Sequence, residues 1–290
     1  MRAMSKVSLR ASQSPMTATE FMDWAPRGAY TTARTVKGTD RVFELNRHME
    51  RLVTSSKPFR KANVSDQDVC KIALCAIGDV MEMSTSLMEE TDCKLTVVIA
   101  FGDCNGQKDG RDIEAFAHIE AMKKTDLSKP VYVALGGPPR HNAIVKDTKW
   151  IHDRKDIVDE SAEDTLLLGN DETVILEGSQ TNFFAVLPSG TIYTAGSGVL
   201  EGTVRAAVID ACNALKIPLL VDAPKVSEIE LFTEAFLAST SRLVMSIDKI
   251  GSHELPRERP IATMVADWVK KHVDERSISV KTFRENTVSD

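Results

Sequence analysis

The sequence predicts an α+β protein built from two domains, and three observations support this fold class. Residues 94–101 (KLTVVIAF) are β-branched and apolar for most of their length, which is typical of a central strand. Residues 69–81 carry apolar side chains at helical spacing, so a helix is expected before that strand. Residues 165–193 hold short strand-like segments separated by turn residues. A chain of 290 residues can bury two cores of this kind.

Charge and hydrophobicity exclude two classes of partner. The formal net charge is −6 and the isoelectric point is about 5.6, so the chain has no broad basic surface for nucleic acid. No uninterrupted apolar run approaches the length that a membrane span requires. We therefore expect partners that are small molecules, with neither a nucleic acid nor a membrane among them.

The cysteines and the amino-terminal residues bear on the compartment. The five cysteines are scattered and lack the close pairs of a zinc site or a disulfide framework, so no metal site and a reducing, cytoplasmic location are expected. Residues 1–19 include Arg2, Lys6 and Arg10 and no acid, a composition also found in transit peptides. A plastid or mitochondrial location is the alternative. Residues 1–20 are expected to form a disordered or targeting tail.

The first domain is expected over residues 21–125 as a small α/β unit. Its elements follow from β-branched segments bounded by turn residues and from apolar side chains at i, i+3 and i+4 spacing. In chain order they are β segments at 28–35 and 42–43 joined by a turn at 38–40, helices from Leu45 and from about Asp66, and neighbouring strands at 94–101 and 115–119.

The second domain is expected over residues 126–290. The polar run 123–129, followed by Pro130, is the best linker candidate. Beyond it, short apolar segments alternate with Asn-Asp, Gly and Ser-Gly turns, which predicts a β-rich lobe decorated by two amphipathic helices. In chain order these elements are strands at 165–168, 173–176, 182–186 and 191–193, and helices at 203–215 and 261–273.

Three short motifs and one lysine carry the chemistry. They are residues 177–184 (EGSQTNFF), 200–205 (LEGTVR) and 239–241 (STS), together with the upstream Lys146. In this order they resemble the active-site elements of the class IV aminotransferases, the fold-type-IV enzymes that use pyridoxal phosphate. The resemblance implies a two-domain fold of that class, with a small α/β amino-terminal lobe and a larger, β-rich carboxy-terminal lobe that binds pyridoxal 5'-phosphate.

The resemblance implies a role for a lysine and for a glutamate. Lys146 matches the lysine that forms the Schiff base with the cofactor, and Lys149, three residues on, is the alternative. Glu177 matches the carboxylate that pairs with the pyridine nitrogen and keeps it protonated, so that the ring can withdraw negative charge from the substrate α-carbon. Asn182, in the same motif, is expected to satisfy backbone groups of the turn.

The resemblance also implies a phosphate site. Backbone N–H groups of Thr203 and Val204, at the start of a helix, match those that hold the cofactor phosphate. Arg51 in HMERL matches the arginine that reaches the phosphate from the first lobe, and Thr240 matches a phosphate-binding threonine. Leu200 matches the residue packed against one ring face. Other cofactor-motif positions depart from the family pattern, since Glu201 stands where proline is usual and a hydroxyl contact from position 204 is lost.

Substrate contacts are expected from Tyr30, Thr32 and Ser241, and the loop 103–110 is expected to shape the same pocket. The segment 31–34 (TTAR) is similar to that of aminodeoxychorismate lyases. The strand at 94–101 is not followed by the arginine that D-amino-acid aminotransferases carry, nor does it hold the arginine of branched-chain enzymes. His48, in the same helix as the phosphate arginine, is expected to be structural.

Three functions therefore stay open. The first is a pyridoxal-phosphate-dependent aminotransferase that moves an amino group between an amino acid and a 2-oxo acid. The second is a lyase resembling aminodeoxychorismate lyase, and the third is a non-catalytic protein that keeps the fold. The stretch GGPPR…VKD…W is similar to plant and algal proteins described as D-amino-acid-aminotransferase-like. Relatives are commonly homodimers, so a homodimer is expected.

Overall fold

The computed structural model describes residues 8–9, 16–102, 112–123 and 129–288, and these fall into two compact units. Unit 1 comprises the described residues up to Lys123, the segment Val145–Ile151 and the described residues from Val273 onward. Unit 2 comprises the remaining described residues up to Ile144 and His152–His272. The chain first leaves unit 1 after Lys123, close to the domain boundary expected at residue 125. Two later segments return to unit 1.

Unit 1 combines two small sheets with five helices that lie wholly inside it among the described residues. Its elements are β1 (Ser8–Leu9), α1 (Ala18–Trp24), β2 (Gly28–Arg34), β3 (Arg41–Phe43), α2 (Leu45–Ser56), α3 (Asp66–Met83), α4 (Thr85–Glu90), β4 (Cys93–Phe101), β5 (Ile113–Ala121), β16 (Ser277–Ser279) and α8 (Val280–Val288). The larger sheet has the order β1-β5-β4-β2, with β1 parallel to β5 and the other pairs antiparallel. Strands β3 and β16 pair separately and antiparallel.

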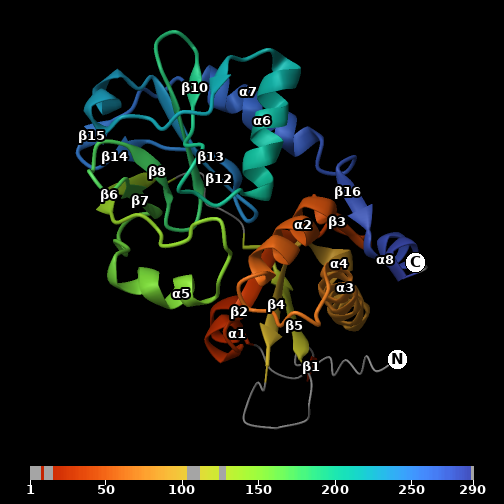
Figure 1. The fold of residues 1–290 in the computed structure, drawn as a ribbon. Coiled ribbons are helices and arrows are strands. Elements are labelled where there is room, and N and C mark those ends of the chain that lie inside the picture. The colour runs from red at the N-terminus through yellow and green to blue at the C-terminus, as the bar shows by residue number, and fades with distance from the viewer. Residues whose placement is uncertain (1–7, 10–15, 103–111, 124–128, 289–290) are drawn as a thin grey trace. The chain divides into compact units, whose positions relative to one another are not determined.

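The larger sheet of unit 1 is covered on both faces because side chains alternate along its central strand β4. Leu95, Val97 and Ile99 join the core that α2 and α3 supply. Val98 and Ala100 face the opposite way and pack with the side chains of α1. Figure 1 shows the strands β2, β4 and β5 beside these helices. Strand β4 is therefore buried on both sides, as its apolar run predicts.

The amino-terminal residues hold two described elements where a tail was expected. Ser8–Leu9 pair with β5, and α1 begins at Ala18 behind a capping box formed by Thr17 and Glu20. In this box the Glu20 carboxylate accepts the Thr17 N–H at 2.7 Å, and the Thr17 hydroxyl accepts the Glu20 N–H at 3.3 Å. The expected tail over residues 1–20 thus contains a strand and the first turn of a helix, and residues 1–7 and 10–15 lie outside the described residues.

Main-chain pairing explains why two later segments belong to unit 1. The Tyr30 N–H donates to the Lys146 carbonyl at 2.9 Å, and the Thr148 N–H donates to the Gly28 carbonyl at 3.0 Å. The segment Val145–Ile151 therefore adds to the free edge of β2. At the end of the chain, β16 pairs with β3 and α8 packs against α3. A single cut near residue 125 could not anticipate these long-range pairings, because they are set by strand edges rather than by composition.

Unit 2 is β-rich, as expected. Its elements are β6 (Tyr132–Gly137), the 3-10 helix η2 (Arg154–Asp156), β7 (Asp164–Leu168), β8 (Ile175–Gly178), β9 (Asn182–Val186), β10 (Ile192–Tyr193), α6 (Thr203–Leu215), β11 (Leu219–Leu220), the 3-10 helix η3 (Val226–Leu231), β12 (Glu234–Ser239), β13 (Leu243–Ser246), β14 (Lys249–Ile250), β15 (His253–Glu254) and α7 (Pro260–Lys271). The helix α5 (Lys149–Asp153) begins in unit 1 and ends in unit 2.

The sheet of unit 2 has the order β11-β10-β9-β8-β7-β6-β14-β15, and β12 joins it by pairing with β9. Phe183 and Phe184 are fully buried and point to opposite faces of β9. Phe183 joins one core, whereas Phe184 stacks on Phe236 of β12 with ring centroids 4.8 Å apart. Helices α6 and α7 pack against each other and against β12 and β13. The strand expected at 173–176 lies two residues later, as β8.

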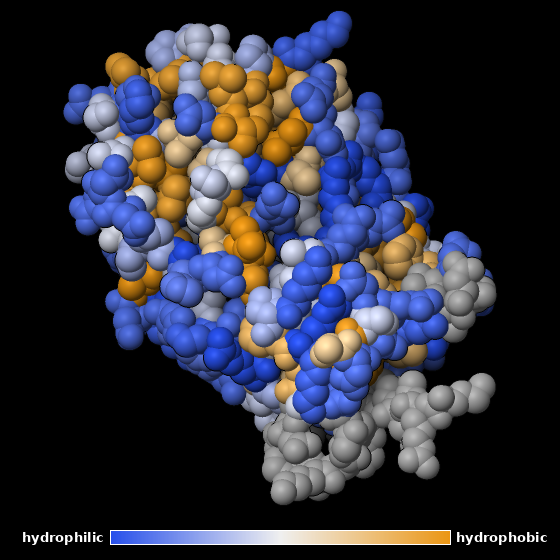
Figure 2. Space-filling model, viewed as in Figure 1, coloured by the Kyte–Doolittle hydropathy of each residue, from blue (hydrophilic) through white to orange (hydrophobic). Residues whose placement is uncertain are grey.

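Among the described residues, no helix is both long and apolar enough to cross a bilayer. Figure 2 shows hydrophilic residues over much of the visible face, with apolar residues gathered over part of unit 2. The described large apolar side chains that are exposed in unit 2 include Leu215, Leu220 and Val221. The linker expected at 123–129 has its residues 124–128 outside the described part of the chain.

Candidate active site

Lys146 lies in unit 1, on the segment that pairs with β2. Its backbone N–H donates to the Ser55 hydroxyl at 2.9 Å, and its carbonyl accepts the Tyr30 N–H at 2.9 Å. Its side chain is half-buried, and Nζ lies 4.5 Å from the centroid of the Tyr30 ring, which is a cation–π distance. The alternative, Lys149, is exposed at the start of α5. The two candidate lysines therefore differ in environment, since Lys146 lies against an aromatic ring and Lys149 faces solvent.

Arg51 is oriented by a short polar chain in unit 1. Its Nη2 donates to the Thr31 hydroxyl at 3.0 Å, and that hydroxyl lies 2.8 Å from Nδ1 of His48. Burial, and then the positive charges of Arg51 and Lys146, hold the pKa of His48 well below its usual value of 6.5. A neutral imidazole can accept the Thr31 hydroxyl proton at Nδ1, so each link has a donor and an acceptor. His48 thus supports Arg51 through Thr31.

Tyr30 and Thr32, the expected substrate contacts of unit 1, lie two residues apart on β2 and therefore on the same face of the strand. Tyr30 is 8% exposed and belongs to a small apolar cluster with Phe21, Val98 and Phe116. Thr32 is half-buried. The third expected contributor in this domain, the loop 103–110, lies outside the described residues.

Glu177 is buried in unit 2, and its carboxylate is fixed by several donors. Oε2 accepts the Leu200 N–H at 3.0 Å and the Asn182 side-chain amide at 3.3 Å. Oε1 lies 3.4 Å from Nη1 of Arg140, and the side chains of Arg140 and Glu177 in this ion pair are 6% and 3% exposed. Asn182 also donates to the Leu200 carbonyl at 2.8 Å. The structure therefore brings Leu200, from the second motif, together with Glu177 and Asn182, which both belong to the first motif.

The turn that follows Glu177 is held by one buried carboxylate, Asp164 at the start of β7. Asp164 accepts hydrogen bonds from the Ser179 hydroxyl at 2.6 Å, the Thr181 hydroxyl at 2.8 Å and the Gln180 N–H at 3.2 Å. A Cβ at Gly178 would lie 2.4 Å from Oδ2 of the same carboxylate. The small and hydroxyl residues of the motif GSQT are therefore those that can close around Asp164.

The helix α6 begins without a side-chain cap. Gly202, its N-cap, has no side chain to cap the helix, and Thr203 and Val204 form the first buried turn. Gly202 has an ordinary backbone conformation, with φ −67°, that any residue could adopt. A glycine is needed there because a larger side chain would not fit. A Cβ there would lie 2.0 Å from Oδ1 of Asn182. Backbone N–H groups at such a terminus, with the helix dipole, suit an anion such as a phosphate.

Thr240 and Ser241 lie in the turn between β12 and β13 and are half-buried. Strand β12, which leads into this turn, packs against α6 within unit 2. The predicted residues thus form two groups. Unit 1 holds Tyr30, Thr32, Arg51 and Lys146, and unit 2 holds Glu177, Leu200, Thr203, Val204, Thr240 and Ser241.

Sequence reasoning missed several residues of these groups. Asp164 begins an apolar strand and resembles any acid at a strand end, and Ser55 is one of two serines that end a helix. Arg140 stands out in the sequence only as the last residue of the GGPPR stretch, and that stretch does not indicate a contact with Glu177. Thr31 stands in the TTAR segment, but nothing in the sequence indicates that it binds Arg51. Among the described residues, no group of three or more His, Cys, Asp or Glu side chains could hold a metal ion.

Comparison with known proteins identifies the family. The sequence model of the family described as Amino-transferase class IV matches residues 28–250, which include every predicted site residue. The chain belongs to the class IV aminotransferase family. A probable branched-chain-amino-acid aminotransferase of Thermotoga maritima is 35% identical over 109 residues, which span 37% of this chain and 38% of that protein. The match thus covers less than half of the relative's own length.

Solved structures show the fold of this family member. The branched-chain aminotransferase of Thermoproteus uzoniensis, solved with norvaline, has a TM-score of 0.72 and 21% identity over 92% of this chain and 95% of that chain. A branched-chain aminotransferase from the organism abbreviated T.th., solved with pyridoxamine 5'-phosphate, has a TM-score of 0.73 and 16% identity over 92% of this chain and 94% of that chain. The α+β fold of the type-IV class, expected from the sequence, is confirmed.

Proposed function

We propose that this class IV aminotransferase family member is a pyridoxal-phosphate-dependent enzyme that moves an amino group between an amino acid and a 2-oxo acid. The observation that carries the proposal is Lys146, the lysine of the family pattern, which is half-buried with Nζ over the Tyr30 ring. The relatives compared above are described as aminotransferases, and one of them was solved with the aminated form of this cofactor. The chemistry of both units fits the cofactor, as follows.

Lys146 would hold the cofactor covalently through Nζ as a Schiff base. When bound, pyridoxal phosphate supplies a ring that withdraws negative charge from the substrate α-carbon. The same amine, when free of the cofactor, would act as the base that takes up the proton of the substrate α-carbon and then as the acid that returns it. The hydrogen bonds of the Lys146 backbone to Ser55 and Tyr30 fix the main chain from which this side chain extends.

Glu177 is suited to the pyridine nitrogen. Its carboxylate is buried and held in a fixed position by the Leu200 N–H, the Asn182 amide and the Arg140 guanidinium. A carboxylate in such a site favours the protonated ring nitrogen. Leu200, whose backbone is tied to both residues, is the proposed apolar contact of the ring.

The amino-terminus of α6 is suited to the phosphate. With no side-chain cap at Gly202, backbone N–H groups of the first turn, at Thr203 and Val204, are the donors of the family pattern. Thr240 is proposed as a further phosphate ligand, and so is Arg51, whose guanidinium is oriented by Thr31. Tyr30, Thr32 and Ser241 are proposed as substrate contacts.

Reductive trapping tests the lysine. The protein is incubated with pyridoxal phosphate, reduced with borohydride and digested, and the peptide that carries the phosphopyridoxyl group is identified by mass spectrometry. We expect the label on Lys146, loss of labelling and of turnover in Lys146→Ala, and both retained in the matched control Lys149→Ala. A label on Lys149, or full turnover by Lys146→Ala, would overturn the assignment.

Substrate assays decide between the proposed reaction and the lyase that the TTAR segment favours. The absorption spectrum of the loaded protein is followed while branched-chain L-amino acids, and then D-alanine, are added. Conversion to the aminated cofactor, with release of a 2-oxo acid, supports transamination. Pyruvate released from 4-amino-4-deoxychorismate without any 2-oxo acid acceptor would support the lyase. A protein that takes up no cofactor would be the non-catalytic member of the family.

We also propose that the protein is a homodimer, because its relatives commonly are. Light scattering coupled to size-exclusion chromatography measures the mass of the particle in solution, which is compared with the mass of one chain, 31.9 kDa. A mass of one chain at the concentration of the activity assay, with full turnover, would contradict this.

A further inference from the structure

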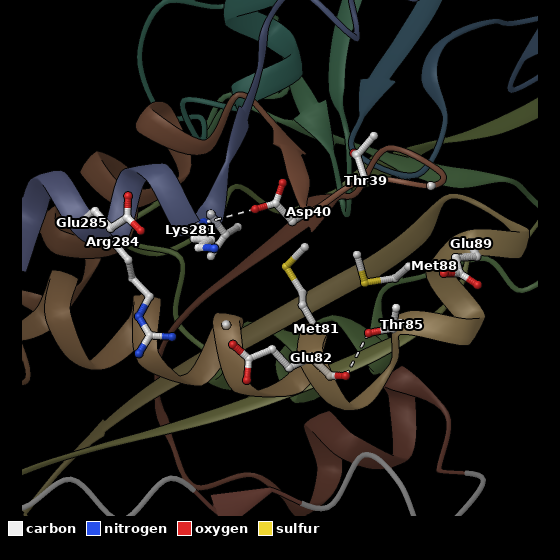
Figure 3. Close-up of a pocket in the computed structure, with 13 residues that line it drawn as sticks. Thr39, Asp40, Met81, Glu82, Thr85, Met88, Glu89, Lys281, Arg284 and Glu285 are labelled. Atoms are coloured by element: carbon white, nitrogen blue, oxygen red, sulfur yellow. Dashed lines mark hydrogen bonds between the residues drawn. The ribbon is translucent and has the colours of Figure 1, made fainter.

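Unit 1 contains a cavity of about 620 Å³ that shares no residue with the proposed cofactor site. It lies between α3, α4, α8 and the turn that joins β2 to β3 (Figure 3). Small-molecule sites commonly have volumes of about 300–1,000 Å³, so this cavity has the size of a ligand site. Since α8 comes from the end of the chain and the other walls come from its first third, the cavity exists only in the folded unit.

The floor of the cavity is apolar. Met81, Met88 and Val280 line it and are 5%, 5% and 3% exposed. Figure 3 shows both methionine side chains pointing from α3 and α4 into the cavity. Methionine thioethers are flexible and polarisable, and they adapt to apolar ligands of varied shape. The floor would therefore contact the apolar part of a bound molecule.

The walls carry charged side chains of both signs. Glu82 and Glu89 belong to α3 and α4, whereas Lys281 and Arg284 belong to α8. Within the described part of the chain, the side-chain charges of these four residues take part in no hydrogen bond or ion pair. Asp40, by contrast, is already engaged, since it accepts the Ser279 hydroxyl at 2.6 Å. The cavity thus offers the carboxylates of α3 and α4 and the cations of α8 above an apolar floor, and Glu285 adds a carboxylate to the α8 wall.

Gly78 explains how Arg284 is seated. A glycine in the interior of an 18-residue helix such as α3 is unfavourable, and it needs a reason. A Cβ at Gly78 would lie 2.5 Å from Nη1 of Arg284, so the guanidinium rests on the bare surface that the glycine leaves. Glu82 is one helical turn further along the same face of α3, which places its Cβ about 6 Å from that of position 78. A cation and a carboxylate are therefore presented one turn apart.

We propose that this cavity binds a zwitterion with an apolar body, namely a free amino acid with a bulky apolar side chain. Its carboxylate pairs with Arg284, its ammonium group pairs with Glu82, and its side chain packs on Met81 and Met88. A phosphate ester would face the carboxylates of Glu82 and Glu89, and a wholly apolar ligand would leave all four charges desolvated. The inference does not rest on the proposed function, because no residue of the cavity takes part in it.

Calorimetric titration of the full-length protein with α-methyl-L-phenylalanine tests the ligand class. This probe has no α-proton, so it cannot complete a transamination. We expect saturable binding, and binding weakened by about tenfold or more for both the N-acetyl derivative and the methyl ester, each of which removes one of the two charges. Absence of saturable binding, or equal affinity for the three compounds, would overturn the proposal.

Variants locate the site. Arg284→Met and Glu82→Gln each remove one charge, and Gly78→Ala displaces the end of the flexible Arg284 side chain while leaving every charge in place. All three are expected to lower the affinity about tenfold, whereas Lys270→Met, which removes an exposed cation from α7 in unit 2, leaves it unchanged. Thermal melting followed by circular dichroism confirms that each variant is folded. Wild-type affinity in all three folded cavity variants would place the binding elsewhere and refute the assignment.

Discussion

Replacing Asp164 with alanine should destabilise unit 2 and release the turn that follows Glu177. The carboxylate is 3% exposed and accepts four hydrogen bonds, from the N–H groups of Thr165 and Gln180 and from the hydroxyls of Ser179 and Thr181. A hydrogen bond to a charged group contributes about 1.5–3 kcal/mol, and the hydroxyls can rotate toward other acceptors, so the four do not add in full. We expect a loss of about 3–5 kcal/mol, a large part of the stability of a typical domain.

Urea denaturation measures the loss, and hydrogen exchange of peptides spanning β7 to β9 locates it. Asp159→Ala is the matched control, because Asp159 accepts the Ser161 N–H and hydroxyl in a similar way but is exposed, so little change is expected. The cofactor affinity of the Asp164 variant should also fall, since Glu177 precedes the released turn. If Asp164→Ala is no less stable than Asp159→Ala, and exchange in β8 and β9 is unchanged, the reasoning fails.

Three further predictions concern single side chains. The folded pKa of His48 lies well below 6.5, so at low pH the unfolded chain binds a proton that the folded chain does not. The free energy of unfolding should therefore fall as pH drops below about 6.5, by up to about 1.4 kcal/mol per pH unit. His48→Gln should flatten the plot of urea midpoint against pH over that range, and an unchanged slope would contradict this. Gly202→Ala should push Asn182 away from Glu177 and weaken pyridoxal phosphate binding about tenfold in equilibrium dialysis, while wild-type affinity would show that the contact is not needed. Burial raises the pKa of the Cys212 thiol to about 11. Iodoacetamide at about pH 8, which is below even an ordinary thiol pKa, should therefore alkylate Cys212 only after denaturation. Rapid labelling of the native protein would refute the burial of this thiol.

Local patterns determined most of the secondary structure. The helix expected at 203–215 is observed with those bounds as α6, because its apolar stripe and its amino-terminal glycine agree. The run at 94–101 becomes β4, since a segment apolar on both faces can be satisfied only between two packed layers. The helix α1 was missed although Thr17 and Glu20 form a capping box, because a basic, serine-rich start suggested a tail.

The motifs also determined the family, since EGSQTNFF, LEGTVR and Lys146 are local and specific, and the family match over residues 28–250 agrees with them. Roles that depend on chemistry at one position, such as a lysine amine or an uncapped helix start, can be proposed from sequence in this way. The individual site roles, and the substrate, remain the proposals given above.

Only the tertiary structure decided which side chains support those positions. The carboxylate that holds the GSQT turn is Asp164, 14 residues before Gly178, and Arg51 is oriented by Thr31 and His48 from two different elements. The segment that carries Lys146 joins the edge of β2 by main-chain hydrogen bonds, which no side-chain pattern encodes. Sequence patterns report the preferences of neighbouring residues, whereas these contacts depend on how strands and helices far apart in the chain are brought into register, and that is a property of the folded unit as a whole.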